Sequence, residues 1–440
     1  MVQIHRGMLI HGNFQKKKGQ GQEARPFRAL QEQWQNNGGE NIESVLDRMK
    51  RENSDKKIAD FMAKEKQPYS FKKRYAAIRA REFAEECDRR GLNYHCSVGG
   101  LDSITLFLFL HSIGIYVDGI SVSYLEDRSI QQVHHALGIQ CLQSAVREVD
   151  PATGVKKRWA KPQIIQEFGF PVLSKEIAAK IELLQNPTEK NKTVRHAIIT
   201  GETGEYGGWQ TDSKMKLAQQ WLELFGGYEN ENEGVNYKKP DFKVSSRCCY
   251  YLKEKPCDDW AKQHNSVPYL GMMASEGGRR AKSLRLHGCN YFGKSTIRSA
   301  PFAIFNRQDL LTLALEMNEW YQQHWQKFSD KHLGTIVPAI YGEIARDEDG
   351  NLRTTKAQRT GCSMCGFGIH MESRPHRFDM MRERNPKEWE YWMYRCVTDP
   401  QTGQQYGWGK VLDYIGVGWE NLPDTDFAGQ CSFFDEGDEP

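Results

Sequence analysis

The sequence predicts an α/β fold, a parallel sheet that is preceded by helices and followed by a helical and loop region with many cysteines. Residues 92–96 are largely apolar and lead into a turn rich in Ser, Gly and Asp at 97–103, after which residues 104–110 form an almost wholly apolar run. This order is typical of a strand, a tight loop and a buried helix. Residues 116–123 read as a second parallel strand, whose carboxyl end would face the same crevice as the loop.

Length and composition limit the classes of protein to consider. A chain of 440 residues with a formal charge of +3 can build a large core and does not demand a nucleic-acid partner. It has no apolar run of about 18 residues and no signal-peptide pattern at its start, so we expect a cytoplasmic protein without a membrane partner. Its 11 cysteines then favour metal ligation, catalysis or buried thiols over a disulfide scaffold.

The order of composition along the chain predicts five segments. Helices are expected before the sheet, the last of them ended by Gly91, and another helix is expected to be capped by Ser174, with Ile177, Ile181 and Leu184 buried. The segments are a basic tail at 1–26, a helical segment at 27–90, a nucleotide-binding α/β domain at 91–245 with a Gly-rich insertion at 201–234, a continuation of the sheet with the cysteine region at 246–420, and an acidic tail at 421–440. Within the insertion, residues 214–224 read as an amphipathic helix.

The turn at 97–103 is the first candidate site. Gly99 and Gly100 lack a Cβ, so the backbone can adopt unusual φ values and approach a ligand closely, and the next helix begins with unpaired N–H groups. The ligand expected there is an anion, most simply a nucleotide phosphate. Ser97, Asp102 and Ser103 complete the candidate set; a glycine pair in such a turn also has a purely conformational interpretation.

The string Ser97-Val98-Gly99-Gly100-Leu101-Asp102-Ser103 resembles the Ser-Gly-Gly-x-Asp-Ser loop of the ATP-pyrophosphatase and phosphoadenosine-phosphosulfate (PAPS) reductase superfamily. The resemblance extends to about residue 419 and is closest to reductase-like proteins of phages and mobile elements. It implies an adenine-nucleotide hydrolase type of sheet. Val98 and Leu101 depart from the family pattern, which leaves the substrate open.

Five further residues are candidates for the nucleotide site. Glu126 and Asp127 follow the second strand and could contact ribose or base, or belong to a solvated loop. The resemblance also places Lys175 near the nucleotide and matches residues 276–280 to a Glu-Ser-x-x-Arg stretch, with Gly277 in the place of the serine. Glu276 and Arg280 are therefore candidates, because Arg can bind phosphate or sulfate with two parallel hydrogen bonds.

A basic cluster at residues 156–161 contains one aromatic residue, Trp159. It is compatible with phosphate or nucleic acid and also with an ordinary solvated surface.

The cysteines suggest a metal centre. Cys248 and Cys249 are adjacent in a short helix that Pro256 is expected to end, and Cys362 and Cys365 form a C-x-x-C in a Gly-flanked loop. With Cys289 they give five candidates for the four ligands of a [4Fe–4S] cluster or a Zn²⁺ ion. The Cys-Cys plus C-x-x-C arrangement resembles iron–sulfur adenosine-phosphosulfate (APS) reductases and so favours a cluster; the set we favour is Cys249, Cys289, Cys362 and Cys365, with Cys248 as the alternative.

The resemblance implies nucleotide-dependent sulfur chemistry in one of two forms. One is reduction of APS or PAPS, with a thiol or electron-donor protein as partner; the other is ATP-dependent thiolation of a nucleic acid or small molecule. The Glu-Cys-Gly-Leu-His motif of sulfite-forming reductases does not occur, and Cys396 and Cys431 read as unrelated thiols. A non-catalytic nucleotide-sensing or nucleic-acid-binding accessory factor on the same fold, and a zinc-stapled structural protein, are the alternatives.

Overall fold

The computed structural model describes residues 42–202, 215–229, 236–325, 332–358 and 360–420, without the side chains of residues 42–51 and 279. The chain divides into two compact units, residues 1–60 and 61–440, and the charged helix α2 (Ile42–Glu65) begins in the first. The tails expected at 1–26 and 421–440, and much of the Gly-rich insertion, lie outside the described residues. Within the described residues, no helix has both the length and the apolar character needed to cross a membrane.

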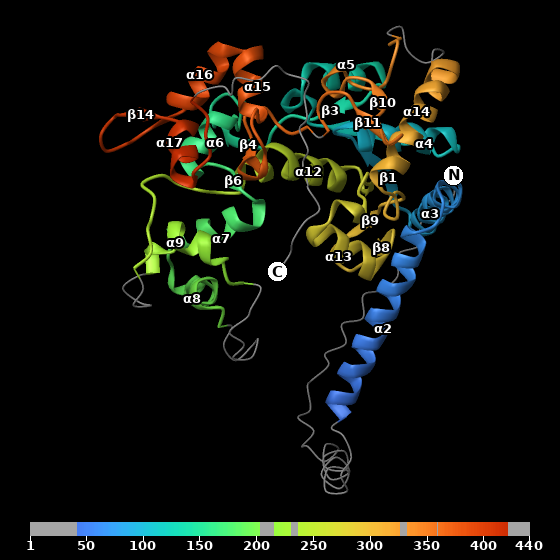
Figure 1. Ribbon diagram of the computed structural model, residues 1–440, viewed down its shortest axis with the longest axis horizontal. Helices are drawn as coiled ribbons and strands as arrows, with labels where there is room; N and C mark the ends of the chain where they lie inside the picture. The colour runs from blue at the N-terminus through green and yellow to red at the C-terminus, as the bar shows by residue number, and fades with distance from the viewer. Residues whose placement is uncertain (1–41, 203–214, 230–235, 326–331, 359, 421–440) are drawn as a thin grey trace, which may run out of the picture. The chain divides into compact units, whose positions relative to one another are not determined.

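A six-stranded sheet forms the centre of the second unit, with the strand order β3-β2-β1-β7-β9-β8 (Figure 1). Its strands are β1 (Asn93–Ser97), β2 (Asp118–Ser121), β3 (Gln140–Cys141), β7 (Ser266–Tyr269), β8 (Asn290–Phe292) and β9 (Ile297–Ser299). All pairs are parallel except β8 with β9, so the predicted parallel sheet is confirmed and gains an antiparallel edge. The second strand is shorter than expected because the chain turns into the 3-10 helix η1 (Ser123–Leu125).

Helices cover this sheet and bury its apolar side chains. They are α3 (Tyr69–Arg90), α4 (Leu101–Ser112), α5 (Arg128–Ala136), α12 (Lys255–Gln263), α13 (Gly278–His287) and α14 (Arg307–His324). Gly91 ends α3 with a φ of 67°, as its sequence position predicts. The apolar run after the loop becomes α4, which is buried from Ile104 to Leu110 and packs on α14.

A second apolar core brings together segments that are far apart in the sequence. In Figure 1 the red helices α15 to α17 lie beside the green elements α6 and β6, and β12 pairs in parallel with β6. Trp408 is fully buried at its centre, with its ring 4.9 Å from that of Phe170. Its elements are α6 (Lys161–Phe168), β6 (Val172–Leu173), α7 (Lys175–Gln185), α8 (Lys192–Thr200), α9 (Gln219–Phe225), β12 (Gly366–Phe367), α15 (Arg377–Arg384), α16 (Pro386–Tyr394), β13 (Val397–Thr398), β14 (Gln405–Tyr406) and α17 (Trp408–Ile415).

Two local predictions in this region have different outcomes. The Ser174 hydroxyl accepts the N–H of Ile177 at 3.1 Å, which confirms the predicted cap of α7. The predicted end of the cysteine helix at Pro256 is wrong. The chain runs from α11 (Arg247–Cys249) through a π-helical turn, η5 (Tyr250–Glu254), directly into α12. Pro256 lies in the first turn of α12, directly after this π-helical turn.

Two small antiparallel ribbons complete the described structure. One joins β4 (Val146–Val149) to β5 (Lys156–Arg158), and the other joins β10 (Ile344–Arg346) to β11 (Leu352–Thr354).

The buried ion pair between α3 and α14 gives a test of the fold. Lys72 Nζ lies 2.7 Å from Asp309 Oδ2, and the two side chains are only 3% and 9% exposed. We expect Lys72→Met to lower the free energy of unfolding by about 3–5 kcal/mol, because Asp309 would remain buried without its counter-charge. Urea unfolding followed by circular dichroism measures this loss.

Lys73→Met is the matched control. The neighbouring pair of Lys73 and Glu316 is 40% and 35% exposed, so its loss should cost less than about 1 kcal/mol. Equal effects of the two substitutions would contradict the packing of α3 on α14.

Candidate functional site

The loop at 97–103 lies where the direction of strand order in the sheet reverses. The strands β1, β2 and β3 extend to one side of it, and β7 and β9 extend to the other. In open α/β sheets the crevice beyond the carboxyl ends of the strands at such a switch point is the usual place for a ligand. The backbone of Gly271, just after β7, reaches this loop, since a Cβ on it would lie 3.0 Å from the Asp102 carbonyl carbon.

The loop is held by its own hydrogen bonds. The Gly99 N–H donates to Ser103 Oγ at 2.7 Å, and the Ser103 hydroxyl donates to the Gly100 carbonyl at 3.0 Å. The expectation of an unusual backbone at the glycines is wrong: neither has a positive φ, and Gly100 has a φ of −79°. The Val98 N–H, next to Ser97 at the end of β1, bonds to the Ile120 carbonyl and aligns the loop with β2.

Tyr341 explains why Gly100 must be a glycine. A Cβ at this position would lie 2.4 Å from the Tyr341 hydroxyl, which accepts the N–H of Leu101 at 3.1 Å. The same hydroxyl is hydrogen-bonded to Thr360 Oγ1 at 2.8 Å. Tyr341 is buried, and burial raises the pKa of its hydroxyl. It therefore stays neutral and joins the first turn of α4 to the loop that carries the C-x-x-C.

Two more side chains hold the loop in place. Asp102 Oδ1 accepts a hydrogen bond from Arg307 at 3.0 Å, and the other arm of that guanidinium donates to the Gln358 carbonyl. Buried His134 has Nε2 at 2.8 Å from the Gly99 carbonyl and Nδ1 at 2.8 Å from the Ser123 hydroxyl. Burial lowers the pKa of His134, so the ring is neutral, donates through Nε2 and accepts from Ser123.

The structure brings four of the five candidate cysteines together. In the C-x-x-C turn the Cys365 N–H donates to the Cys362 carbonyl at 3.1 Å. Burial is the main cause that raises the pKa of Cys248 and Cys249 to about 12, and in both cases the thiols of Cys362 and Cys365 raise it further. Cys248 and Cys249 therefore lie near enough to Cys362 and Cys365 for the thiols to interact electrostatically.

Cys289 lies elsewhere. It is buried in the core of the α/β unit, where Arg79 and Tyr75 influence its thiol. It precedes β8, whereas Cys362 borders the segment that follows β2, and β1, β7 and β9 lie between these two strands. At the usual strand spacing this amounts to about 19 Å. The group of neighbouring thiols in the structure therefore includes Cys248 and not Cys289.

A lysine accompanies the cysteines. Lys253, on η5, forms an ion pair of 2.7 Å with Glu126. Burial opposes its charge, but the Cys362 thiolate and the Glu126 carboxylate outweigh burial and raise the pKa of Lys253. Within the part of the chain that the structure describes, no three His, Cys, Asp or Glu side chains stand ready as ligands of a single metal ion.

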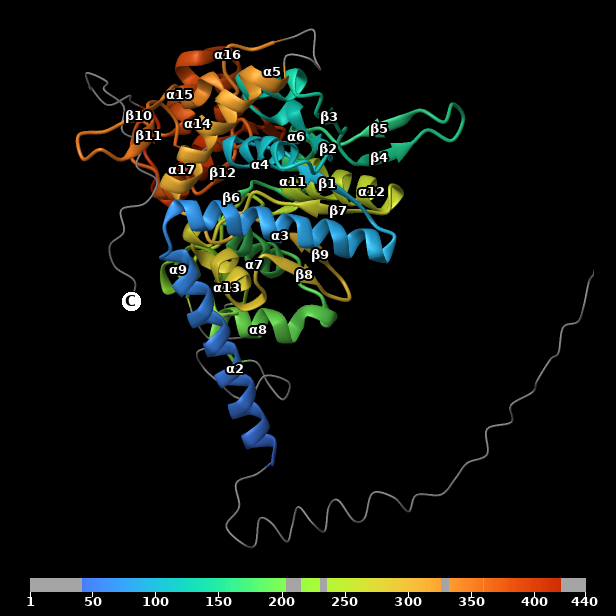
Figure 2. The same cartoon turned by 90° about the vertical axis from the view of Figure 1, so that its right-hand side faces the viewer.

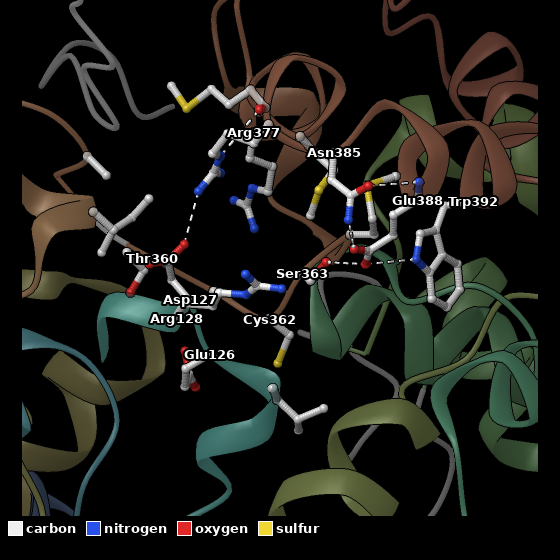
Figure 3. Close-up of a pocket in the computed structure, with 18 of the residues that line it drawn as sticks. Glu126, Asp127, Arg128, Thr360, Cys362, Ser363, Arg377, Asn385, Glu388 and Trp392 are labelled. Carbon is white, nitrogen blue, oxygen red and sulfur yellow. Dashed lines mark hydrogen bonds and ion pairs between the residues drawn. The ribbon is translucent and has the colours of Figure 1, made fainter. Parts of the chain in front are cut away.

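A cavity of about 750 Å³ opens beside the cysteine loop (Figure 3). Its walls come from the segment after β2 (124–128), the cysteine loop (360–364), and α15 and α16 with the turn between them. Thr360 is part of the wall, and the loop at 97–103 lies behind it, one side chain away through Tyr341.

The charges around the cavity are largely matched. Glu126 pairs with Lys253, Asp127 with Arg384 at 3.0 Å, and Glu372 with Arg377. Glu388 accepts hydrogen bonds from Asn385 and Ser363, as the dashed lines in Figure 3 mark. Lys161 donates only to a carbonyl, that of Ser363, and lies 5.1 Å from the Trp392 ring. Lys161 and Arg128 therefore leave a positive charge on the wall that suits an anionic ligand.

The remaining predicted residues are distributed over three places. Asp127 caps α5, where Oδ1 accepts the Ser129 N–H at 2.9 Å, and lines the cavity. Lys175 forms an ion pair with Glu254 on η5, on the side of the cysteine helix. Glu276 and Arg280 pair with each other at 2.6 Å on the segment after β7, and the Arg280 side chain is 61% exposed.

Sequence reasoning missed three residues that shape the site: Tyr341, His134 and Lys253. Tyr341 lies in a segment to which the sequence alone assigns no role. His134 occupies the buried face of α5, four residues after Ile130, which was a usable signal. Lys253 lies four residues after Cys249, and only the fold shows that it faces Cys362.

Together these features describe an α/β protein whose switch-point loop is linked through Tyr341 to the cysteine loop that lines the cavity. Comparison with protein families, with curated proteins and with solved structures finds no match to the chain.

The contact between Gly100 and Tyr341 can be tested by a double-mutant cycle. We expect Gly100→Ala to destabilise the protein by about 1–3 kcal/mol, because the added methyl group overlaps the Tyr341 hydroxyl. Tyr341→Phe removes that hydroxyl, so the double variant should be more stable than the sum of the two single effects predicts. Denaturant unfolding of the four proteins measures the coupling.

Gly99→Ala is the control, since its new Cβ would be 3.8 Å from Ser103 Oγ, an ordinary contact. Additive effects of Gly100→Ala and Tyr341→Phe on the free energy of unfolding would contradict a direct contact between residue 100 and the Tyr341 hydroxyl.

Proposed function

We propose that this chain is a nucleotide-dependent enzyme of sulfur chemistry, related to the PAPS reductases and built on an adenine-nucleotide hydrolase type of sheet. The observation that carries the proposal is the pair of hydrogen bonds of the Tyr341 hydroxyl, because they link the phosphate-loop candidate to the cysteine loop that lines the cavity. A loop for phosphate and a group of thiols in contact through a single side chain suit a reaction in which a nucleotide and sulfur meet.

The loop supplies the phosphate-binding groups. Ser97, Gly99, Gly100, Asp102 and Ser103 end β1 and open α4, where the helix dipole favours an anion. Arg307 stands 3.0 Å from Asp102 and adds a fixed positive charge at the same point. We infer that the nucleotide phosphates lie against this turn, and that a phosphate oxygen takes over the Leu101 N–H from the Tyr341 hydroxyl.

The cysteine group suits an iron–sulfur cluster better than a single zinc ion. Within the described residues, four thiols from helix α11 and the cysteine loop are near neighbours without being gathered as ligands of one ion. A [4Fe–4S] cluster is wider than a zinc ion, so its thiolate ligands stand farther apart. Cys248, Cys249, Cys362 and Cys365 would hold it, with Lys253 and Lys161 beside them to offset the negative charge of the thiolates. A bound cluster would supply redox or electrostatic chemistry next to the nucleotide.

Two reactions fit this arrangement. In thiolation, an oxygen of the target attacks the α-phosphorus of ATP; an O–P bond forms, pyrophosphate leaves, and sulfur later displaces AMP. In reduction, a thiolate attacks the sulfur of APS or PAPS; an S–S bond forms, the bond from that sulfur to the phosphate oxygen breaks, and AMP or PAP leaves. A thiol of the donor protein then attacks the thiolate-derived sulfur of that S–S bond, which releases sulfite and leaves a disulfide. The absence of a Glu-Cys-Gly-Leu-His motif from the sequence favours thiolation. A non-catalytic nucleotide-sensing factor is the second candidate, distinguished by nucleotide binding without release of pyrophosphate, AMP or sulfite.

Asp102→Ala tests the nucleotide site. It removes the carboxylate that holds Arg307 at the loop, so two charged groups are lost from the place of the phosphates. We expect ATP binding to weaken at least about tenfold, and pyrophosphate release to fall with it, while the thermal midpoint changes little. Titration calorimetry and a pyrophosphate assay measure the two effects. Asp88→Ala, an exposed carboxylate on α3, is the control; normal affinity in Asp102→Ala would reject the loop as the nucleotide site.

Cys362→Ser and Cys289→Ser together test the metal centre. After purification without oxygen we expect stoichiometric iron and acid-labile sulfide in the parent protein, loss of both in Cys362→Ser, and retention in Cys289→Ser, because Cys289 belongs to a different core. Elemental analysis and the visible absorption spectrum give the answer. If the parent protein contains zinc and no iron, the cysteines hold a structural zinc ion and not a cluster. If Cys289→Ser loses the metal and Cys362→Ser keeps it, the proposed set of ligands is wrong.

A further inference from the structure

The ribbon of β4 and β5 lies on the surface of the protein and carries charged side chains on both strands. Every residue of the two strands is exposed, and Figure 2 shows the hairpin projecting away from the central sheet. A two-stranded ribbon without a covering layer is only marginally stable in water. Its exposed valines, Val149 at 51% and Val155 at 58%, would be poorly placed on a surface that nothing covers.

One face of the ribbon combines apolar and basic side chains. The register pairs Val146 with Arg158 and Val149 with Lys156, and cross-strand partners point to the same face. Acidic side chains near this face are already engaged: Asp150 accepts the N–H groups of Ala152 and Thr153 in the turn, and Glu148 pairs with Lys157 on the opposite face. The face is therefore positive with apolar patches.

Aromatic side chains lie at the base of the ribbon and lead toward the cavity. Arg147 lies 5.0 Å from the Trp159 ring, which contacts Tyr251, and the neighbouring Tyr250 is 40% exposed. Tyr124, 41% exposed, is close enough to Arg158 for that charge to affect the pKa of its hydroxyl, and it lines the cavity. Lys161, three residues after the ribbon, lies on the cavity wall as well.

We propose that the β4–β5 ribbon docks a single-stranded nucleic acid, with the phosphate backbone along its basic face and a base directed past Tyr124 into the cavity. Positive side chains beside exposed aromatic rings are the combination that binds unpaired strands, by phosphate attraction and base stacking. A second copy of this chain is disfavoured because two basic faces repel each other. The proposal rests on the proposed function in one respect: it makes a nucleic acid the target of the nucleotide-dependent reaction.

The test uses the full chain and fluorescent 20-nucleotide oligomers of one sequence, as single-stranded RNA, single-stranded DNA and duplex DNA. Lys156→Glu/Arg158→Glu reverses the two positive charges of the basic face of the ribbon. Lys190→Glu/Lys192→Glu makes the same change in net charge at exposed positions in and just before α8. We expect the ribbon variant to bind single strands at least about tenfold more weakly, with a salt slope lower by about 2, and the control variant to bind like the parent. Anisotropy at several salt concentrations measures both, and the RNA and DNA arms identify the sugar.

Each other outcome overturns the inference. The inference fails if both variants bind single strands equally weakly, if the parent binds duplex DNA as tightly as single strands, or if the parent binds no nucleic acid. It also fails if the only effect of the ribbon variant is the loss of a dimer in sedimentation. ATP affinity measured on the same proteins separates the two proposals. Normal ATP binding without nucleic-acid binding would reject the ribbon and leave the nucleotide site intact. Nucleic-acid binding through the ribbon without ATP binding would reject the nucleotide site alone.

Discussion

The hydrogen bonds of the Tyr341 hydroxyl are the constraint on which the candidate site depends. This one oxygen accepts the Leu101 N–H at the start of α4 and bonds to Thr360, which leads into the C-x-x-C turn. The position of Gly100 follows from it, since any larger residue would overlap the hydroxyl. The sheet fixes one side of the crevice, the cysteine loop forms the other, and a buried neutral phenol keeps them in contact.

Around this bridge the site is built from charges that are matched in pairs. Asp102 with Arg307, Asp127 with Arg384 and Glu126 with Lys253 each join segments that are distant in the sequence. Such pairs are partly exposed, so they contribute less to stability than to the positions of the groups. The charge that these pairs leave unmatched on the cavity wall is positive, which would favour an anionic ligand. The basic face of the β4–β5 ribbon has charge of the same sign.

The cysteine group shows how two cores share one site. Cys248 packs with Trp159 and Leu252 in a small cluster, whereas Met364, inside the C-x-x-C, belongs to the second core around Trp408. The two halves of the cysteine group are therefore positioned independently and meet only in the folded protein. Lys253 is carried by the same continuous helix as Cys248 and Cys249, so its charge accompanies them wherever that helix packs.

Local signals in the amino-acid sequence are enough to predict some of the elements. The strand, loop and buried helix at 93–112, the cap at Ser174 and the stop at Gly91 follow from apolar periodicity and backbone chemistry that a few neighbouring residues supply. Which distant residues meet depends on the folded chain. It separated Cys289 from the other cysteines by placing β8 at the far edge of the sheet, set Tyr341 against Gly100, and paired Lys175, Glu276 and Arg280 with carboxylates or with each other. The physical reason is that these contacts depend on strand order and on the packing of two cores, and neither is encoded in the spacing of any one segment.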